Sequence, residues 1–190
     1  VGVDPADGTL LWEKLWPAQQ TAGRWKANTA VAPSPVGVGG DRIFVTAGYK
    51  AGSAMFKVNG PEVRTLWYRT PEQLNSDTQT PILWKDHLFF VHHNDQFVCA
   101  NLDGELVWRS PDDTKFGLGS FLLADGLLFI MEGDTGVLHL VEASIEGWKP
   151  LARAKVVPGH EAWAPMALVN GKLICRDLTD MVCLQVGQSE

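Results

Sequence analysis

Two short runs in the chain combine an aromatic side chain with polar groups that could bind a ligand. They are His160-Glu161-Ala162-Trp163 and Arg24-Trp25-Lys26-Ala27-Asn28. An indole beside hydrogen-bonding groups suits a planar ligand. The competing interpretation is that Trp25 and Trp163 only pack against neighbouring loops. His160 and Glu161 have the residue types of an acid–base pair, but adjacent residues on an extended chain point apart, which argues against that role.

Other catalytic and metal-binding patterns are absent from the sequence. It contains no Gly-rich phosphate loop, no Gly-x-Ser-x-Gly elbow and no His-Glu-x-x-His motif, which excludes the common nucleotide-binding and hydrolase classes. The adjacent His92 and His93 flank a turn, where we expect solvated side chains. We expect the three cysteines, Cys99, Cys175 and Cys183, to be buried core residues, because zinc sites need paired ligands at short spacing. No metal site is predicted.

The elements that carry these residues follow a repeat of four short strands. Apolar runs at 80–84, 88–91, 96–100 and 105–108 are too short for helices and are separated by polar turns. Similar turn and strand signals align Ile43, Leu88, Leu128 and Leu173, at steps of 45, 40 and 45 residues. A period near forty with four strands per unit predicts an all-β fold, a β-propeller of four-stranded antiparallel blades.

A second recurrence marks the end of each unit, where a polar turn precedes a tryptophan. The turn needs a side-chain acceptor and a residue that tolerates positive φ. The indole that follows offers a large flat surface for docking one blade on the next. We expect this structural docking role for Trp12, Trp67, Trp108 and, less faithfully, Trp148.

This recurrence resembles a known repeat, Ala-x-Asp-x-x-Thr-Gly-x-x-x-Trp, the tryptophan-docking motif of pyrroloquinoline quinone (PQQ) propellers. Quinoprotein alcohol dehydrogenases and outer-membrane assembly lipoproteins carry this PQQ-like repeat, and the resemblance covers nearly the whole chain. The unit at Trp67 has Glu62-Val63 in place of Thr-Gly, and the unit at Trp148 lacks the turn. The best matches are Gly2-x-Asp4-x-x-Asp7-Gly8-x-x-x-Trp12 and Cys99-x-Asn101-x-Asp103-Gly104-x-x-x-Trp108.

The repeat divides residues 1–190 into about four blades of a single partial propeller domain. We expect the end of a blade at 1–13, blades at 29–69, 80–109 and 119–154, and an incomplete last blade at 164–187. The two ends of the chain could pair and close a four-bladed ring. Because propellers of the resembled family usually close with seven or eight blades, we favour the C-terminal half of a larger ring.

Chain direction in such a fold gathers two sets of loops on one face, around the central channel. The first set leads into the innermost strands and supplies the candidate ligand or partner face, comprising Trp25, Asn28, Asp77, Gln79, Lys115, His160, Glu161 and Trp163. The second set joins the second and third strands, and contains Tyr49, Lys50, His92, His93, Asn94, Asp95, Glu132, Asp134, Arg176 and Asp177. Loops carry function more often than the scaffold does.

The resemblance implies two alternative functions. A PQQ-dependent dehydrogenase of alcohols or sugars would need a cofactor clamp, usually with a vicinal disulfide, and a calcium ion held by Glu, Asn and Asp. The chain has no Cys-Cys pair, although Asp77, Asn28 and Glu161 are of suitable type for calcium. We therefore expect a binding or scaffold module with no catalytic residue and no cofactor, the alternative being a dehydrogenase with PQQ and calcium.

Composition limits the partners. A net charge of -6, without a local cluster of Lys and Arg, argues against nucleic acid. No run approaches the ~20 apolar residues of a membrane span. The expected partners are a protein or a polysaccharide on the loop face, and the rest of the same propeller. The resemblance implies a periplasmic or extracellular location.

Overall fold

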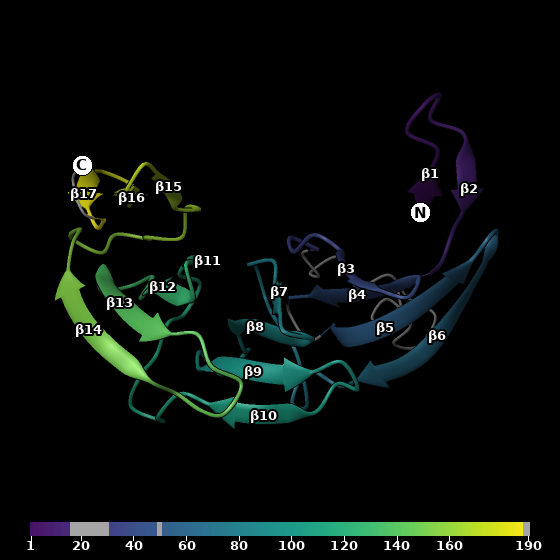
Figure 1. Cartoon of the computed structure of the whole chain (residues 1–190), viewed down its shortest axis with the longest axis horizontal. Coiled ribbons are helices and arrows are strands. Elements are labelled where there is room, and N and C mark those ends of the chain that lie inside the picture. Colours follow the sequence, from purple (N-terminus) through teal and green to yellow (C-terminus); the bar gives the residue numbers. More distant parts are fainter. Residues whose placement is uncertain (16–30, 49–50, 188–190) are drawn as a thin grey trace.

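The computed structural model describes residues 1–15, 31–48 and 51–187, and this part of the chain forms seventeen strands and no helix. The strands build five antiparallel sheets, numbered here in chain order, which succeed one another along an open arc (Figure 1). In each sheet, strands adjacent in sequence are adjacent in space. The predicted all-β propeller architecture is confirmed.

Three of the sheets have four strands. Sheet 2 contains β3 (Val36–Gly39), β4 (Arg42–Ala47), β5 (Gly52–Asn59) and β6 (Glu62–Arg69). Sheet 3 contains β7 (Ile82–Trp84), β8 (His87–Val91), β9 (Phe97–Asn101) and β10 (Leu106–Arg109). Sheet 4 contains β11 (Phe121–Ala124), β12 (Leu127–Met131), β13 (Val137–Glu142) and β14 (Pro150–Lys155).

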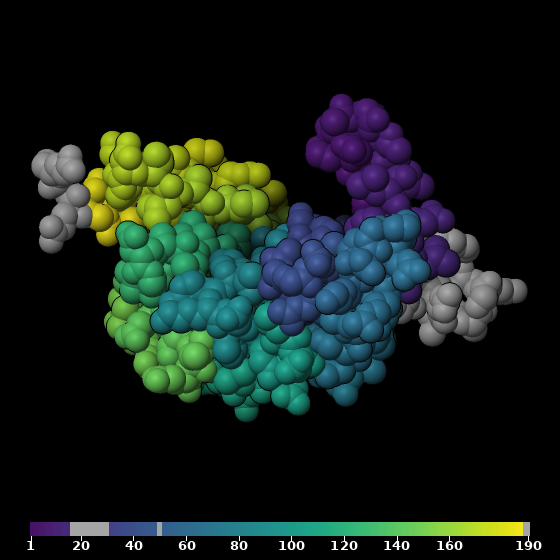
Figure 2. All heavy atoms as spheres, turned by 45° about the vertical axis from the view of Figure 1, so that its right-hand side comes forward, coloured from purple at the N-terminus to yellow at the C-terminus, as the bar shows by residue number. Residues whose placement is uncertain are grey.

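The two end sheets are smaller. Sheet 1 contains β1 (Gly2–Val3) and β2 (Leu10–Trp12), and sheet 5 contains β15 (Ala167–Val169), β16 (Lys172–Arg176) and β17 (Met181–Gln185). They lie at opposite ends of the arc, and no strand of one pairs with a strand of the other (Figure 1). The N-terminal hairpin of sheet 1 projects from the body of the molecule (Figure 2).

The turn between the first and second strands of sheets 2 to 5 explains the sequence repeat. Each turn has two residues, and both adopt positive φ, as a type I′ hairpin requires. This backbone favours Gly, Asn and Asp, the residue types that recur there. The four pairs are Gly40–Asp41, Lys85–Asp86, Asp125–Gly126 and Asn170–Gly171.

The core consists of apolar layers between successive sheets, because successive residues of a strand face opposite sides. On β8, Leu88 and Phe90 pack toward sheet 2, whereas Phe89 and Val91 pack toward sheet 4. All four are buried, so β8 is apolar on both faces after His87 and does not alternate. A third layer, with Phe129 and Leu173, joins sheets 4 and 5.

Two of the recurrent tryptophans connect their sheet to the following one, Trp67 from sheet 2 to sheet 3 and Trp108 from sheet 3 to sheet 4. Trp67 Nε1 on β6 donates a hydrogen bond to the Leu102 carbonyl of sheet 3, at 3.0 Å. Its ring lies so close to Gly104 that a Cβ there would meet it at 3.0 Å. Trp108 Nε1 on β10 donates to the Ser144 carbonyl, also at 3.0 Å.

Trp148 differs from this pattern. It lies in the connection before β14 and not on a strand. Its ring packs back against Trp108, with centroids 6.1 Å apart, and against Phe116, at 5.9 Å. Without the turn that sets the geometry at Trp67 and Trp108, the indole fills the layer between sheets 3 and 4.

The cysteines do not share one environment. Cys99 and Cys175 are buried as expected, but Cys183 is exposed. Cys183 belongs to β17, the last strand of sheet 5, which pairs with another strand along one edge only. The expectation of burial was wrong at this position, because no further strand or sheet of the described chain covers β17.

Candidate binding face

The connections between sheets and the loops between second and third strands meet on one face, which we call the loop face. Its described segments are 70–81, 92–96, 110–120, 132–136, 156–166 and 177–180. Trp25, Asn28, Tyr49 and Lys50, which were predicted to belong to it, lie outside the described residues. The remaining candidates all lie on these segments or beside them.

A chain of backbone hydrogen bonds runs along this face. The N–H of His93 donates to the Asn75 carbonyl, and the N–H of Phe116 donates to the Asp95 carbonyl. The chain continues from the N–H of Gly133 to the Phe116 carbonyl and from the N–H of Ala162 to the Gly133 carbonyl. Each connection is thereby tied to the loop beside it, which fixes the positions of the side chains that project from the face.

Gln79 joins three connections near the centre of the face. Its Nε2 donates to the Trp163 carbonyl at 3.0 Å and to the Leu118 carbonyl at 3.3 Å. The structure therefore brings together two of the predicted residues, Gln79 and Trp163, that are 84 positions apart. The contact uses the main chain of Trp163, so sequence alone did not indicate it.

The indole of Trp163 lies on the loop between β12 and β13. A Cβ on Gly133 would stand 2.8 Å from Trp163 Cδ1 and 3.0 Å from Nε1, so only glycine admits the ring at this distance. The half-buried ring has its Nε1 fully covered, with no hydrogen-bond partner among the described residues. The indole of Trp163 thus packs against a neighbouring loop, which agrees with the interpretation of this residue as a packing residue and not as a surface for a planar ligand.

Carboxylates surround Asp95 on the loop face. Burial raises the pKa of Asp95, Lys115 acts in the opposite direction, and the negative charges of Asp134 and Asp77 raise it further. Lys115 itself donates from Nζ to the Asn94 carbonyl at 2.8 Å. Asp77 accepts a hydrogen bond of 2.6 Å from Asn75 Nδ2. Asp77 and Asp134 are therefore close enough to influence Asp95, and Lys115 and His93 offset part of their charge.

His92 lies beneath these groups and is almost completely buried, with 2% of its surface exposed. The expectation of a solvated turn histidine was wrong here, because the connections before β7 and β11 cover the turn. Neither ring nitrogen has a hydrogen-bond partner among the described residues. Burial lowers the pKa of His92 to about 4, and electrostatic repulsion from His93 and Arg109 lowers it in the same direction. The ring is neutral at pH 7.

A small polar cavity lies beside His92, with a volume of about 10 Å³. His92, Asp77, Gln79 and Asp95 contribute to its wall, and Gly117 is one of the residues that close it. This volume is at the lower limit for one water molecule. A neutral imidazole offers one donor and one acceptor, so a single water is the ligand that such a cavity suits. Sequence reasoning missed Gly117, since nothing local marks it.

His160 and Glu161 lie near sheet 5 and are exposed. The N–H groups of Gly159 and His160 donate to Asp177 Oδ2, at 3.0 and 3.2 Å. Burial acts to raise the pKa of Asp177, but hydrogen bonds from Asp180, Thr179, His160 and Gly159 together lower it. Asp177 is therefore an anionic anchor that holds this segment of the face.

A buried polar pair stabilises the loop between β12 and β13. His139 Nε2 lies 2.6 Å from Glu132 Oε1, and both side chains are largely buried. Thr135 Oγ1 donates to the other oxygen of Glu132. Glu132 was expected on the loop face, whereas His139 was missed, because its place within a strand gave no signal of a polar partner.

The described residues contain no group of three His, Cys, Asp or Glu side chains that could hold a metal ion. They also contain no helix long and apolar enough to cross a membrane. Asn28, one member of the calcium trio, lies outside the described ranges. The remaining two, Asp77 and Glu161, are on different connections and do not fit a calcium site by themselves.

Solved structures with a similar fold include two natural proteins and one design. BamB from Moraxella catarrhalis is 16% identical, with a TM-score of 0.59, over 80% of this chain and 43% of that one. AztD from Citrobacter koseri is 14% identical, with a TM-score of 0.53, over 82% and 44%. The computationally designed Ika4 protein is 11% identical, with a TM-score of 0.60, over 95% and 99%.

These likenesses concern the fold alone, and the chain spans less than half the length of the BamB structure. A comparison with curated protein sequences finds no match. The profile of one family, described as outer membrane protein assembly factor BamB, matches residues 1–108, which is more than half of the chain. Together with the PQQ-like repeats and the stacked four-stranded sheets, this match establishes that the chain belongs to the BamB family of β-propellers.

Proposed function

We propose that the protein is an extracytoplasmic binding module whose loop face docks a partner protein. The observation that carries the proposal is the chain of backbone hydrogen bonds from Asn75 to Ala162, which holds the loops of successive sheets in one arrangement. A pre-organised surface loses little conformational entropy on binding. The name of the family, an outer-membrane assembly factor, supports both a protein partner and a location outside the cytoplasm.

The side chains on this face suit recognition better than catalysis. Lys115, Asp134, His160 and Glu161 are exposed and carry or can carry charge, and the first two lie on different segments of the face. Dispersed charges of both signs give specificity and orientation to a protein interface. Bond-making chemistry would instead need a nucleophile or base held within hydrogen-bond reach of an activating group.

Site-specific photo-crosslinking in the native organism tests the proposal. A photoreactive residue at Asp134, on the loop face, is expected to capture one defined protein partner. The matched control is Asp125, in the turn between β11 and β12 at the other end of the same sheet. Capture of the same protein from Lys115, with none from Asp125, would support the proposal. Equal capture from both ends, or capture of a glycan only, would contradict it.

The proposal includes no cofactor. Incubation with PQQ and calcium is expected to give no bound quinone absorbance and no dye-linked oxidation of alcohols or sugars. Measurable oxidation that is lost in an Asp77→Asn variant would overturn the binding-module proposal in favour of the dehydrogenase. A polysaccharide ligand would instead appear as saturable binding of a glycan that the Glu161→Gln variant weakens.

We also propose that further blades of the same propeller cover the two ends of the arc. Large apolar side chains are exposed at each end, with Val3 at 52% and Leu10 at 56% on sheet 1 and Met181 at 68% on sheet 5. Exposed apolar sheet faces and free strand edges favour association. In a protein with additional blades, Met181 is expected to be protected from oxidation. In the 190-residue chain alone, it is expected to be oxidised readily.

A further inference from the structure

The register of sheet 2 places three cations in one row. Arg42 on β4 pairs directly with Lys57 on β5, which pairs directly with Arg64 on β6. Directly opposed residues point to the same face of a sheet, so the three side chains project together. They are 15 and seven positions apart in sequence, which is why no basic cluster is visible there.

Within the part of the chain that the structure describes, no carboxylate forms an ion pair with these three side chains. The ion pairs among the described residues join His139 to Glu132 and Lys149 to Glu142 and Glu146, and none involves the row. The one hydrogen bond found for the three side chains runs from Arg42 Nε to the Gly39 carbonyl, at 3.2 Å. Arg64 is exposed, and Arg42 and Lys57 are partly exposed. A chain of net charge -6 thus carries a local row of positive charges that have no ion-pair partner among the described residues.

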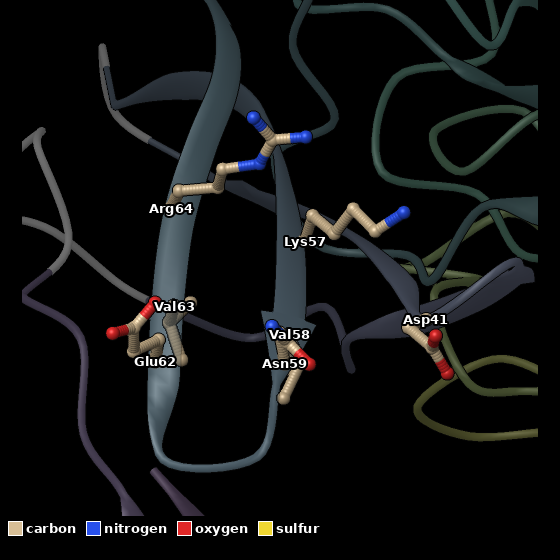
Figure 3. A pocket seen from close by; sticks show the side chains of 7 residues that line it. All are labelled: Asp41, Lys57, Val58, Asn59, Glu62, Val63 and Arg64. Carbon is tan, nitrogen blue, oxygen red and sulfur yellow. The ribbon is translucent and has the colours of Figure 1, made fainter.

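Two members of the row border an open groove of about 730 Å³, and the third, Arg42, lines the adjoining hollow that shares Val58 and Asn59 with it. Lys57 and Arg64 line it from adjacent strands, and their side chains project to the same side (Figure 3). Glu62 lies at the hairpin end with its carboxylate turned away from them, and Asp41 stands across the groove (Figure 3). The groove lies at the turns β3–β4 and β5–β6, which are at the opposite strand ends from the loop face.

We propose that this groove docks an extended acidic segment of a protein partner. Neighbouring strands are ~4.8 Å apart, so three cations span roughly 10 Å, a length over which an extended chain presents two carboxylates on the same side. Two of the cations are arginines, whose guanidinium groups bind carboxylates through paired hydrogen bonds. The groove lies away from the loop face, so this docking proposal can be tested separately from the proposed function.

A flat anionic membrane fits the groove less well than a single segment. Asp41 and Glu62 lie on two sides of the groove, and their charges would repel a broad layer of lipid phosphates. A narrow peptide can contact the row of cations without approaching either carboxylate. The observations therefore favour the peptide over the membrane.

Binding of a fluorescent hexapeptide of alternating Glu and Thr, measured by anisotropy at low salt, tests the proposal. Its counterpart with Gln in place of Glu is the ligand control. The double variant Lys57→Gln, Arg64→Gln is expected to weaken binding about tenfold, the size of losing a charge-assisted hydrogen bond. The matched control Arg153→Gln, Lys155→Gln removes the same charge from exposed positions on β14 and should stay within about twofold of the parent protein.

Stability of the same variants separates binding from folding. Like charges directly opposite one another on a sheet repel, so the Lys57→Gln, Arg64→Gln protein should unfold at a midpoint no lower than the parent. If the double variant were unfolded, the single Arg64→Gln change at an exposed position would replace it, with the same direction expected. Three outcomes would overturn the proposal: no binding of the acidic peptide by the parent protein, equal weakening in both double variants, or Lys57-dependent binding of phosphatidylglycerol vesicles without peptide binding.

Discussion

At the scale of single residues, His92 has the most unusual environment. Its ring is buried beneath the connections before β7 and β11, beside a cavity of about 10 Å³, and both nitrogens lack partners among the described residues. An imidazole in such a place is held neutral, because a charged ring would lose its hydration without gaining a hydrogen bond. Protonation of His92 therefore works against the fold.

The pH dependence of stability follows from this shift. The pKa of His92 falls from 6.5 to about 4 on folding, so between these values the unfolded chain binds more protons than the folded one. Stability is complete above pH 6.5, is lost as the pH falls toward 4, and levels off below. A shift of this size corresponds to at most about 3 kcal/mol. Urea unfolding at pH 7 and pH 5 measures the part of this loss that occurs above pH 5, which is about 2 kcal/mol.

The control for this prediction removes the titrating group. His92→Phe keeps a flat ring but cannot be protonated, and it should reduce the difference in unfolding free energy between pH 7 and pH 5. An unaltered pH dependence in His92→Phe would show that another group is responsible.

The environment of a residue such as His92 could not be predicted from the sequence. The sequence placed His92 correctly in a turn on the loop face, but burial was missed because the covering residues, Gly117 and Leu118, belong to a connection 25 positions later. The contact of Gln79 with the Trp163 carbonyl was missed for the same reason. Contacts that a side chain makes with the backbone of a distant loop leave no mark on the residue types of that loop.

At the scale of elements, the turns were the most predictable features. A two-residue hairpin turn needs positive φ at both residues, which favours Gly, Asn and Asp. The pairs Asp125–Gly126 and Asn170–Gly171 therefore predicted a turn and a strand on each side of it. The tryptophans were less uniform. Trp67 and Trp108 donate to the following sheet, whereas Trp148 packs back against Trp108, because its unit lacks the turn that would orient it.

This difference predicts unequal costs for two substitutions in the layer between sheets 3 and 4. Trp108→Phe removes the hydrogen bond to the Ser144 carbonyl as well as part of a ring, and should lower the free energy of unfolding by about 2–3 kcal/mol. Trp148→Phe removes only ring volume and should cost about 1 kcal/mol. Urea unfolding of the two variants, matched in chemistry and in location, measures the difference. Equal losses would mean that the indole hydrogen bond contributes nothing.

At the scale of the whole molecule, the arc is a row of sheets that each contact their neighbours. Sheets 3 and 4 have apolar layers on both faces, with Phe89 and Phe97 on one side of sheet 3 and Leu88 and Phe90 on the other. Sheet 5 has one such layer, around Leu173. Stability in stacked architectures is close to a sum of local terms and contacts between neighbours.

Hydrogen exchange should therefore vary along the arc. Amides of β8, β9 and β12 are expected to exchange slowest, because their sheets are covered on both faces and opening them requires loss of two layers. Amides of β17 and of the β1–β2 hairpin should exchange fastest, since Met181 and Leu10 are more than half exposed. Mass spectrometry of peptic fragments during exchange measures this order. If sheet 5 exchanged as slowly as sheet 3, the arc would unfold as one cooperative unit, and layers between sheets would not be the source of its stability. A gradient that falls from the middle toward both ends would instead identify those layers as the main stabilising contacts.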